Sequence, residues 1–390
     1  MRYLMKKRII PFFLCLLFFS FQAGARGAGG QEPTTIPYHN VNGKLIVDVE
    51  IGGKVRPFLF DTGASRTCIT DSLYRELNPA VIRQVDVRDS GGNRGKSPVV
   101  NLDTLRVGDW TFCNIRGIVI SLDNPLIECY SIAGILGSDI LQRKTVHISS
   151  RDSLLTFSED VSPWGLRKKD GTKMTILGTR PHMKVYSRNG DRRTFQWMLI
   201  DTGASGYSST VNNHFQHLSE KGVLADEQEA FGQSSYGVHG VEVSGRQRRG
   251  ILPQMELNGV LLDSVPVHST AGGTSLLGTF ILKYGDVTID YRQKRFYYHP
   301  FQDSIRVKEH PFSRLNIIFD DRQMVVGVIW DEELAQLIRP GDRVMEINGC
   351  PAEDYPLCDF FTGAIRFEGE NRIRQFKVET QSGEILEIER

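Results

Sequence analysis

The sequence predicts a mainly β protein made by internal duplication and followed by a smaller α+β segment. The first observation is a repeated motif: residues 61–65 read Asp-Thr-Gly-Ala-Ser, and residues 201–205 read the same. The second is that short apolar stretches bounded by turn residues surround both copies, as is typical of β-rich proteins. The third is that residues 312–390 take no part in the repeat.

Each copy of the motif directly follows an apolar stretch, residues 57–60 in the first copy and residues 197–200 in the second. A short apolar run before a turn that contains glycine is typical of a buried strand. Helical patterns then follow over residues 69–77 and 209–218. The same order of strand, turn and helix is therefore predicted in both halves.

A second pair of anchors lies further along each copy. Residues 135–141 contain Ile-Leu-Gly, and residues 276–282 contain Leu-Leu-Gly at the matching place. Anchors that stay in register over such a length indicate a duplicated unit. Two alternating strands are predicted after each anchor, over residues 145–149, 154–157, 287–291 and 295–299.

Residues 158–173 contain proline, glycine and a run of charges, which indicates a linker between the copies. The second copy ends near residue 302. We therefore predict a first lobe over residues 33–160, a second lobe over residues 172–302 and a separate C-terminal domain over residues 312–390.

The N-terminus has the pattern of an export signal. Four basic residues lie within residues 2–8, an apolar run covers residues 9–21, and Ala-Gly-Ala at residues 23–25 offers a cleavage site. The apolar run is shorter than the about 20 residues that span a bilayer; an uncleaved anchor is the alternative. We expect a signal peptide over residues 1–25, export to the periplasm or beyond the cell, and no other membrane contact.

Composition, net charge and cysteine content bear on which classes of function are expected. With 40% hydrophobic residues and a formal net charge of +1, the chain can bury real cores and lacks the basic excess that would favour nucleic acid. Five cysteines remain beyond the signal, so at most two disulfides form. Cys113–Cys129 and Cys350–Cys358 are the nearest pairs, and the pairing stays open. No Cys/His spacing suggests zinc, and we expect neither a metal nor a cofactor.

The acidic residue that begins each repeated motif is the candidate for catalysis. Peptide hydrolysis without a metal or a covalent intermediate needs a base that activates water and an acid that protonates the leaving amine. Two carboxylates about 3 Å apart cannot both ionise, so they share one proton and supply both functions. A duplicated unit with one acidic loop in each copy would bring Asp61 and Asp201 together.

Residues next to these aspartates, and behind them, are predicted to hold them in place. Glycine lets the backbone turn sharply and aim N–H groups at a carboxylate. Threonine hydroxyls are predicted to hydrogen-bond between the copies, and the apolar-Gly segments to pack behind the loops. These orienting and supporting residues are Thr62, Gly63, Thr202, Gly203, Leu136, Gly137, Leu277 and Gly278.

The doubled Asp-Thr-Gly-Ala, each with a distal apolar-apolar-Gly, resembles the aspartic protease family; over residues 35–300, each unit is similar to a retroviral-type protease subunit. The resemblance implies a bilobal pepsin/retropepsin-like acid protease fold and an endopeptidase that cuts extended peptides next to apolar residues. It implies that Asp61 and Asp201 are the catalytic dyad, with Thr62 and Thr202 as the hydrogen-bonding pair between lobes. Because both aspartates lie on one chain, catalysis requires no dimer.

The resemblance also implies a flexible β-hairpin flap over the cleft. Gly91 and Gly92 lie about 30 residues beyond the first aspartate, and residues 232–240, which include Tyr236, lie at a similar distance beyond the second. Either segment, or both, is a flap candidate. The alternative for each is an ordinary hairpin turn.

The residue after each glycine bears on the pH range. Many pepsin-type enzymes carry a hydroxyl residue there, whereas the retroviral type carries alanine, as at Ala64 and Ala204. Loss of a hydrogen-bond donor to the charged carboxylate raises its pKa. We therefore predict activity at mildly acidic or near-neutral pH, rather than in strong acid alone.

Residues 339–349 read Arg-Pro-Gly-Asp-Arg-Val-Met-Glu-Ile-Asn-Gly, a tight turn into an alternating strand that ends in an Asn-Gly turn. This string resembles the bacterial PDZ-domain signature, which implies a peptide ligand bound by strand addition. A Gly-Leu-Gly-Phe-like loop is not found, so packing on the protease body is the alternative. The whole layout resembles bacterial exported proteases, which favours the periplasm. The rival function is a non-catalytic peptide-binding envelope protein.

Overall fold

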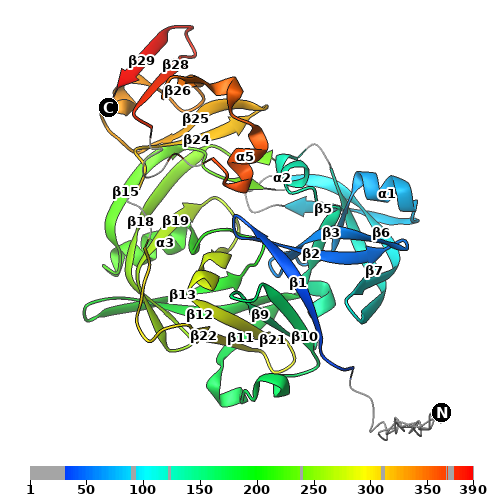
Figure 1. Ribbon diagram of the computed structural model, residues 1–390. Helices are drawn as coiled ribbons and strands as arrows, with labels where there is room; N and C mark the ends of the chain where they lie inside the picture. The colour runs from blue at the N-terminus through cyan, green and yellow to red at the C-terminus, as the bar shows by residue number, and fades with distance from the viewer. Residues whose placement is uncertain are drawn as a thin grey trace, which may run out of the picture. The chain divides into compact units, whose positions relative to one another are not determined.

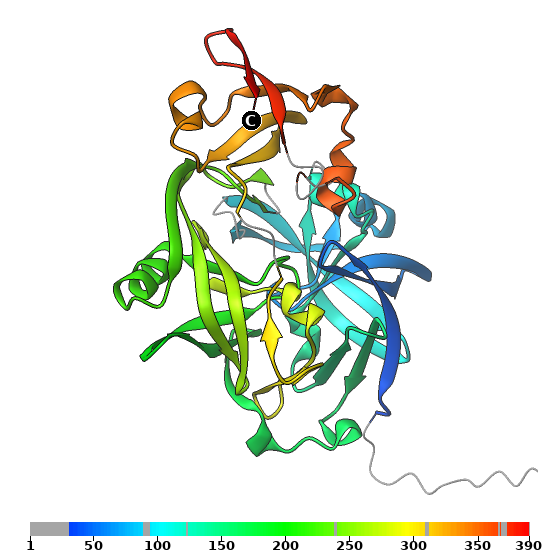
Figure 2. The same cartoon turned by 60° about the vertical axis from the view of Figure 1, so that its left-hand side comes forward.

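The computed structural model describes residues 31–88, 94–121, 124–237, 240–308, 312–365, 367 and 373–389. Residues from Glu32 onward form one compact unit (Figure 1; Figure 2). Strands outnumber helices throughout it, so the protein is mainly β, as the sequence predicts. The predicted signal peptide lies outside the described residues. Among the described residues, no helix is both long and apolar enough to cross a bilayer.

The first part of this unit, residues 32–158, is called lobe 1. Its strands are short and are joined by tight turns and two helices. The elements are β1 (Thr34–Val41), β2 (Lys44–Ile51), β3 (Lys54–Asp61), β4 (Cys68–Thr70), α1 (Asp71–Leu77), β5 (Val81–Arg88), β6 (Arg94–Val107), β7 (Trp110–Ile120), α2 (Pro125–Cys129), β8 (Gly134–Gly137), β9 (Thr145–Ser149) and β10 (Leu154–Ser158).

The second part, residues 172–308, is called lobe 2. It contains one helix and a long hairpin whose end carries two short strands. The elements are β11 (Thr172–Leu177), β12 (Arg180–Asn189), β13 (Arg192–Ile200), β14 (Ser208–Val211), α3 (Asn212–Glu220), β15 (Ala225–Gly232), β16 (Tyr236–Gly237), β17 (Gly240–Val241), β18 (Gly245–Leu257), β19 (Val260–Thr270), β20 (Ser275–Leu277), β21 (Gly285–Asp290), β22 (Arg295–Pro300) and β23 (Ile305–Arg306).

The third part, residues 312–389, is called the C-terminal module. It has its own hydrophobic core, which includes Phe319, Val326 and Phe376. Asn348 and Gly349 adopt positive φ between two antiparallel strands, which is the Asn-Gly turn that the sequence predicts. The elements are β24 (Leu315–Asp320), β25 (Gln323–Ile329), α4 (Leu334–Leu337), β26 (Arg343–Ile347), β27 (Cys350–Pro351), α5 (Leu357–Thr362), β28 (Gln375–Glu379) and β29 (Ile385–Glu389).

The two lobes share a pattern of strand pairing. In lobe 1, β3 runs parallel to β8 and β4 runs parallel to β7. In lobe 2, β13 runs parallel to β20 and β14 runs parallel to β19. Long antiparallel hairpins, β5–β6 and β15–β18, occupy the same place in each order. Each aspartate is therefore carried to the end of a buried strand by the same local arrangement.

A shared sheet joins the lobes beneath the aspartates. Its strand order is β1-β10-β9-β21-β22-β11, so three strands come from each lobe and β9 pairs with β21 at the centre. At that centre, His147 lies opposite Thr288, and its Nδ1 lies 2.8 Å from the threonine hydroxyl. The sheet fixes the two lobes against each other and so sets the separation of the loops above it.

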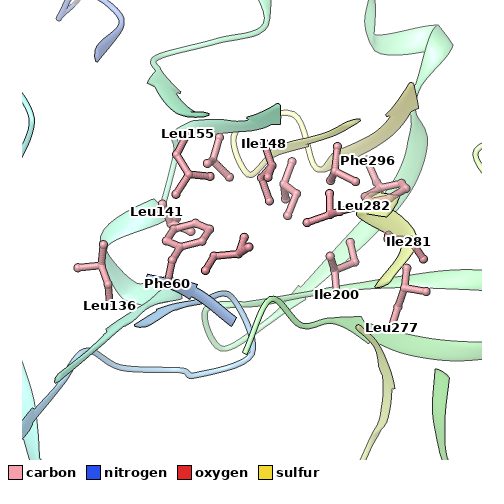
Figure 3. Packing of buried hydrophobic residues seen from close by; sticks show 14 of the residues in the cluster. Phe60, Leu136, Leu141, Ile148, Leu155, Ile200, Leu277, Ile281, Leu282 and Phe296 are labelled. Atoms are coloured by element: carbon pink, nitrogen blue, oxygen red, sulfur yellow. The ribbon is translucent and has the colours of Figure 1, made fainter. Parts of the chain in front are cut away.

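The core above this sheet is continuous between the lobes. Phe60 and Leu136 of lobe 1 face Ile200 and Leu277 of lobe 2 over a layer of side chains from the shared sheet, among them Ile148 (Figure 3). These five side chains are at most 3% exposed. Burial of each large apolar side chain contributes about 1.5–3 kcal/mol, so the strands that end at the aspartates are held firmly.

Both helices that follow the repeated motifs begin later than the sequence predicts. Residues 68–70 form β4, which lies between β7 and β8, and the helix starts at Asp71 with Thr70 as its cap. In lobe 2, β14 occupies residues 208–211, and α3 starts at Asn212. The difference arises because Ile69 is fully buried between two partner strands, and this tertiary pairing overrides the local helical pattern.

A disulfide joins Cys129 of α2 to Cys358 of α5, with their Cα atoms 4.7 Å apart. Neither of the pairs that lie nearest in sequence forms, because the contact of α2 with α5 brings together cysteines that are 229 positions apart. Cys68, Cys113 and Cys350 are free. The C-terminal module is thus bonded covalently to lobe 1.

Candidate active site

The two aspartates lie at the ends of equivalent strands. Asp61 is the last residue of β3 and pairs with Gly137 of β8, whereas Asp201 directly follows β13, and its N–H donates to the carbonyl oxygen of Leu277 at 2.9 Å. Parallel pairing on one side of each strand leaves the following loop free to turn toward the other lobe. The two acidic loops meet there.

Contacts of the two glycines show how closely the carboxylates approach. A Cβ placed on Gly63 would stand 2.4 Å from Cγ of Asp201, and a Cβ placed on Gly203 would stand 2.3 Å from Cγ of Asp61. Real Cβ contacts do not reach such distances, so each glycine packs against the carboxylate of the opposite lobe. Neither glycine has a positive φ. Close approach is therefore what requires glycine here. The backbone also turns at both positions and directs the N–H of each glycine to the carboxylate of its own loop, as the sequence predicts.

A reciprocal set of hydrogen bonds links the threonines that follow the aspartates. The N–H of Thr62 donates to Oγ1 of Thr202 at 2.9 Å, and the N–H of Thr202 donates to Oγ1 of Thr62 at 3.1 Å. Each hydroxyl then donates onward, from Thr62 to the carbonyl of Ile200 at 2.6 Å and from Thr202 to that of Phe60 at 2.9 Å. Both threonines are at most 5% exposed, so these bonds fix the loop separation in a dry environment.

The hydrogen bonds to the two carboxylates are not equal. Oδ1 of Asp61 accepts from the N–H groups of Gly63 at 2.8 Å and Ala64 at 2.9 Å. Oδ1 of Asp201 accepts from the N–H of Gly203 at 2.9 Å, while the N–H of Ala204 donates to the main-chain carbonyl of Asp201 instead. Since hydrogen bonds to a carboxylate favour its charged form, Asp61 is the better placed of the two to carry the negative charge.

The pKa of Asp201 leads to the same distinction between the two carboxylates. Burial, together with the nearby charge of Asp61, raises the pKa of Asp201 to about 8, although the positive charge of Lys44 acts in the opposite direction. The protonated form of Asp201 is therefore favoured at neutral pH. A pair of carboxylates that shares one proton titrates as a unit.

The supporting residues lie directly behind the loops. Leu136 and Leu277 are at most 1% exposed and belong to the core shared by the lobes. A Cβ on Gly137 would lie 2.4 Å from the carbonyl carbon of Arg66, and one on Gly278 would lie 2.5 Å from the carbonyl oxygen of Gly206. These glycines let the two halves of each loop pack without a gap.

Sequence reasoning missed the hydroxyl residues that follow these glycines. The N–H of Ser138 donates to the carbonyl of Ala64 at 2.9 Å, and the N–H of Thr279 donates to that of Ala204 at 2.9 Å. The hydroxyl of Ser138 donates to the same carbonyl as its N–H, at 2.8 Å, whereas Oγ1 of Thr279 lies 3.2 Å from the carbonyl of Ala204 and closer, at 2.7 Å, to that of Gly43. A hydroxyl after Leu-Gly in both copies of the repeat was the signal that could have identified them.

The two flap candidates have different outcomes. Gly91 and Gly92 lie outside the described residues, and the prediction for them stays untested. Tyr236 lies on the β15–β18 hairpin, but its ring packs edge-on against Phe361 of α5, with centroids 4.7 Å apart. The hairpin also contacts β25 of the module, since the N–H of Gln233 donates to the carbonyl of Gly327 at 3.1 Å. In this structure the hairpin is thus held by the C-terminal module.

Lobe 1 also contacts Phe361 of the C-terminal module. The carbonyl oxygen of Phe361 accepts from the hydroxyl of Tyr130 at 2.7 Å and from Nδ2 of Asn42 at 3.1 Å. Asn42 lies at the end of the β1–β2 hairpin, and its carbonyl accepts from the hydroxyl of Ser205, next to the second acidic loop, at 2.7 Å. One residue of α5 is therefore linked to both lobes beside the site.

Comparison with known sequences identifies one family. Residues 47–140, which contain the first Asp-Thr-Gly, match the aspartyl protease family. No curated protein sequence gives a significant match.

Many solved structures align with this chain, and two of them illustrate the likeness. One is a retropepsin-like aspartic protease from Rickettsia conorii, with 20% sequence identity and a TM-score of 0.25, covering 33% of this chain and 92% of that protein. The other is Basic 7S globulin from soybean, with 11% identity and a TM-score of 0.42, covering 69% of this chain and 95% of that protein.

Proposed function

We propose that the protein is an aspartic endopeptidase in which Asp61 and Asp201 activate water for peptide hydrolysis. The observation that carries the proposal is the reciprocal packing of each glycine against the opposite carboxylate, with a Cβ of Gly63 or Gly203 placed 2.4 or 2.3 Å from it. The aspartyl protease match over residues 47–140 supports the same activity. Two carboxylates brought this close on a buried, hydrogen-bonded platform have the arrangement that general acid–base hydrolysis needs.

The inequality of the carboxylates assigns their roles. Asp61, which accepts two N–H bonds, takes a proton from water as the water oxygen attacks the peptide carbonyl carbon. Asp201, whose pKa of about 8 keeps it protonated, gives its proton to the carbonyl oxygen. The tetrahedral diol then collapses: the C–N bond breaks, Asp61 delivers its proton to the amine, and Asp201 recovers one from a diol hydroxyl. Each cycle therefore restores the starting protonation.

The pH range follows from this assignment. Asp201 must hold its proton for the first step, and that proton is lost near pH 8. We propose that the activity extends from mildly acidic to near-neutral pH, in line with the alanines at positions 64 and 204. A profile of kcat/KM against pH that shows no cleavage above about pH 4, the range of an unperturbed carboxyl group, would contradict the proposed roles.

We propose that the enzyme is exported and that its substrate is an extended peptide or protein. The Cys129–Cys358 disulfide supports export, because disulfides form and persist in oxidising compartments such as the periplasm. Both aspartates are supplied by one chain, so the proposed enzyme acts without a dimer. The proposed substrate preference for apolar side chains next to the cleaved bond rests on the family resemblance alone.

The test compares the wild type with Asp61→Asn and Asp201→Asn on a reduced, alkylated protein that has no fold of its own. We expect cleavage by the wild type and a loss of about 10²–10⁴-fold in both variants, since each removes a group that contributes general acid–base catalysis of that size. Fragments should be identified by mass spectrometry. Equal cleavage by all three proteins would refute the assignment, and no cleavage by any of them would favour the rival, a peptide-binding protein.

A further inference from the structure

The β1–β2 hairpin of lobe 1 extends onto the acidic loop of lobe 2. Its turn, Asn42-Gly43, accepts two hydrogen bonds from lobe 2: the hydroxyl of Ser205 donates to the carbonyl of Asn42, and that of Thr279 donates to the carbonyl of Gly43, each at 2.7 Å. A Cβ on Gly43 would stand 2.8 Å from Oγ1 of Thr279. The residue after this turn, Lys44, is therefore held firmly beside the second aspartate.

The side chain of Lys44 turns toward the dyad. Its Nζ donates to the carbonyl oxygen of Gly203. Gly203 is the residue whose N–H donates to Asp201 at 2.9 Å and whose Cα packs against the carboxylate of Asp61. Lys44 therefore hydrogen-bonds, from the opposite lobe, to the residue that contacts both carboxylates.

Lobe 2 has an equivalent hairpin without this contact. Arg180 pairs with Leu177 across the β11–β12 turn as Lys44 pairs with Val41 across the β1–β2 turn. The hydroxyl of Thr179 donates to the carbonyl of Ser65 at 2.8 Å, so this hairpin is also bonded to the acidic loop of the other lobe, with the donor on the hairpin instead of the loop. Among the described residues, however, no hydrogen bond joins the Arg180 side chain to the Asp61 loop. The contact made by Lys44 is one-sided.

We propose that Lys44 is a positioning residue of the proposed catalytic site, which fixes the Gly203 peptide and supplies a positive charge that balances the single negative charge of the dyad. This inference rests on the proposed function and names a third charged participant in the same site. The position of Lys44 also makes the two halves of the site unequal, because Lys44 interacts more strongly with the charge of Asp201 than with that of Asp61.

Burial lowers the pKa of Lys44 below its ordinary value, and the negative charges of Asp201 and Asp61 offset part of that shift and favour the charged ammonium. Other titratable groups that sense Asp61 are the thiol of Cys68 on β4 and the phenol of Tyr291 after β21, and burial raises the pKa of both, which keeps them neutral. Within lobe 1, the charge of Asp139 also acts on the thiol of Cys68. In lobe 2, the ammonium group of Lys283 lies over the ring of Phe280, 3.7 Å from its centroid.

The consequence is a shift of the working pH range. A cation beside two carboxylates lowers both macroscopic pKa values of the pair. Removal of the charge should therefore move both limbs of the pH profile upward, by about one pH unit for a nearby opposite charge. In the variant, a second proton should occupy the dyad at mildly acidic pH, where the wild type still works.

The experiment measures the pKa values of the Asp61 and Asp201 carboxylates directly, by NMR titration of protein with 13Cγ-labelled aspartates. The variants Asp61→Asn and Asp201→Asn serve to assign the two signals. Three variants are compared with the wild type. Lys44→Met removes the charge and the donor; Lys44→Gln removes the charge but keeps an amide that can donate to the Gly203 carbonyl; Arg180→Met is the matched control on the equivalent hairpin. We expect upward shifts of about one unit in the two Lys44 variants and none in the control.

Kinetics supply the second measurement. The kcat/KM profile of Lys44→Gln should move upward by the same amount, and Lys44→Arg should restore the wild-type profile. A uniform fall in kcat with an unchanged profile, or a shift of equal size in Arg180→Met, would overturn the inference. Because NMR titration needs no turnover, absence of cleavage by the wild type would count against the proposed function without deciding the role of Lys44. If Lys44→Met does not fold, Lys44→Gln decides the outcome.

Discussion

Cys129 and Cys358 form a disulfide that ties lobe 1 to the C-terminal module, although 229 positions separate them in the chain. The bond lies between α2 and α5, one residue from Tyr130 on one side and three from Phe361 on the other. These two residues are themselves joined by the 2.7 Å bond from the Tyr130 hydroxyl to the Phe361 carbonyl. The covalent and hydrogen-bonded links together place α5 beside the proposed site.

Loss of this disulfide should destabilise the protein. Removal of a native disulfide typically costs about 2–5 kcal/mol, in part because the unfolded chain gains freedom. The double variant Cys129→Ser/Cys358→Ser should unfold at a lower urea concentration than the wild type, as followed by tryptophan fluorescence. Cys113→Ser, at an exposed free cysteine, is the control and should behave as the wild type does. Equal midpoints for the double variant and this control would show that the bond adds nothing to stability.

The close approach at Gly63 predicts a severe effect of one methyl group. In Gly63→Ala the new Cβ would stand 2.4 Å from Cγ of Asp201, so the acidic loops must move apart. A displacement of about 1 Å at a catalytic group can cost about 100-fold in rate, and we expect a loss of at least that size in kcat. Gly273→Ala is the matched control, because its Cβ would meet no atom within 4 Å and its φ is not positive. Full activity in Gly63→Ala would refute the packing described here.

The threonine pair predicts a difference between two similar substitutions. Thr62→Val keeps the shape but removes the hydroxyl, which leaves the N–H of Thr202 and the carbonyl of Ile200 buried without their partner. Each buried unsatisfied group costs about 1–3 kcal/mol, so the free energy of unfolding should fall by roughly 2 kcal/mol or more. Thr62→Ser keeps the hydroxyl and should lose far less. Urea unfolding of both variants at one pH gives the comparison, and equal losses would argue that packing of the methyl group matters more than the hydrogen bonds.

The raised pKa of Asp201 predicts that stability depends on pH. Its pKa is about 8 in the folded state against an ordinary value of 3.8, so between these values the folded protein holds a proton that the unfolded chain has lost. The free energy of unfolding contributed by this group therefore falls as pH rises from about 4 to about 8. Asp201→Asn cannot ionise, and it should gain stability relative to the wild type progressively over that range.

Urea unfolding of the wild type and Asp201→Asn at pH 5 and pH 8 measures this effect. Asp191→Asn, at an exposed turn position, serves as the reference substitution. A stability difference between Asp201→Asn and wild type that is the same at both pH values would mean that Asp201 is not protonated in the folded state at neutral pH.

The contact of Tyr236 with Phe361 predicts that the module restrains the β15–β18 hairpin. Removal of either ring, in Tyr236→Ala or Phe361→Ala, should weaken this restraint and leave the strand contact near Gln233 and the bond from Arg249 to the Ser313 carbonyl. Amide hydrogen exchange over the β15–β18 hairpin should then become faster. Phe231→Ala is the control on the same hairpin, since its ring is 64% exposed. If exchange is unchanged in both ring variants, the contact does not restrain the hairpin.

Several features of the site were predictable because short sequence motifs indicate them, and each of these motifs occurs in both copies of the repeat. The repeated Asp-Thr-Gly predicts paired loops, and the structure brings Thr62 and Thr202 within hydrogen-bonding distance as that repeat suggests. Leu136 and Leu277 could be found because an apolar-Gly pattern recurs at matching distances. Because the unit is duplicated, each motif can be checked against its second copy, which is impossible for a motif that occurs once.

Other features had no local signal. Lys44 lies 17 positions before Asp61 and touches the loop of the other lobe, and nothing in its neighbourhood marks it as different from an ordinary basic residue at a strand start. The disulfide was missed because sequence distance favours short pairs, whereas the contact of α2 with α5 decides it. The helix starts at Asp71 and Asn212 were misjudged because β4 and β14 pair with distant strands.

The sequence by itself determined that two carboxylates, each with its own threonine, glycine and apolar support, are carried by two similar β-rich units on one chain. Only the tertiary structure decided what surrounds them: which lysine faces the dyad, why Gly63 and Gly203 have no room for a side chain, and where Tyr236 is held. The physical reason is that periodicity and turn chemistry act over a few residues, whereas charge, close packing and strand addition act between segments that only the fold brings together.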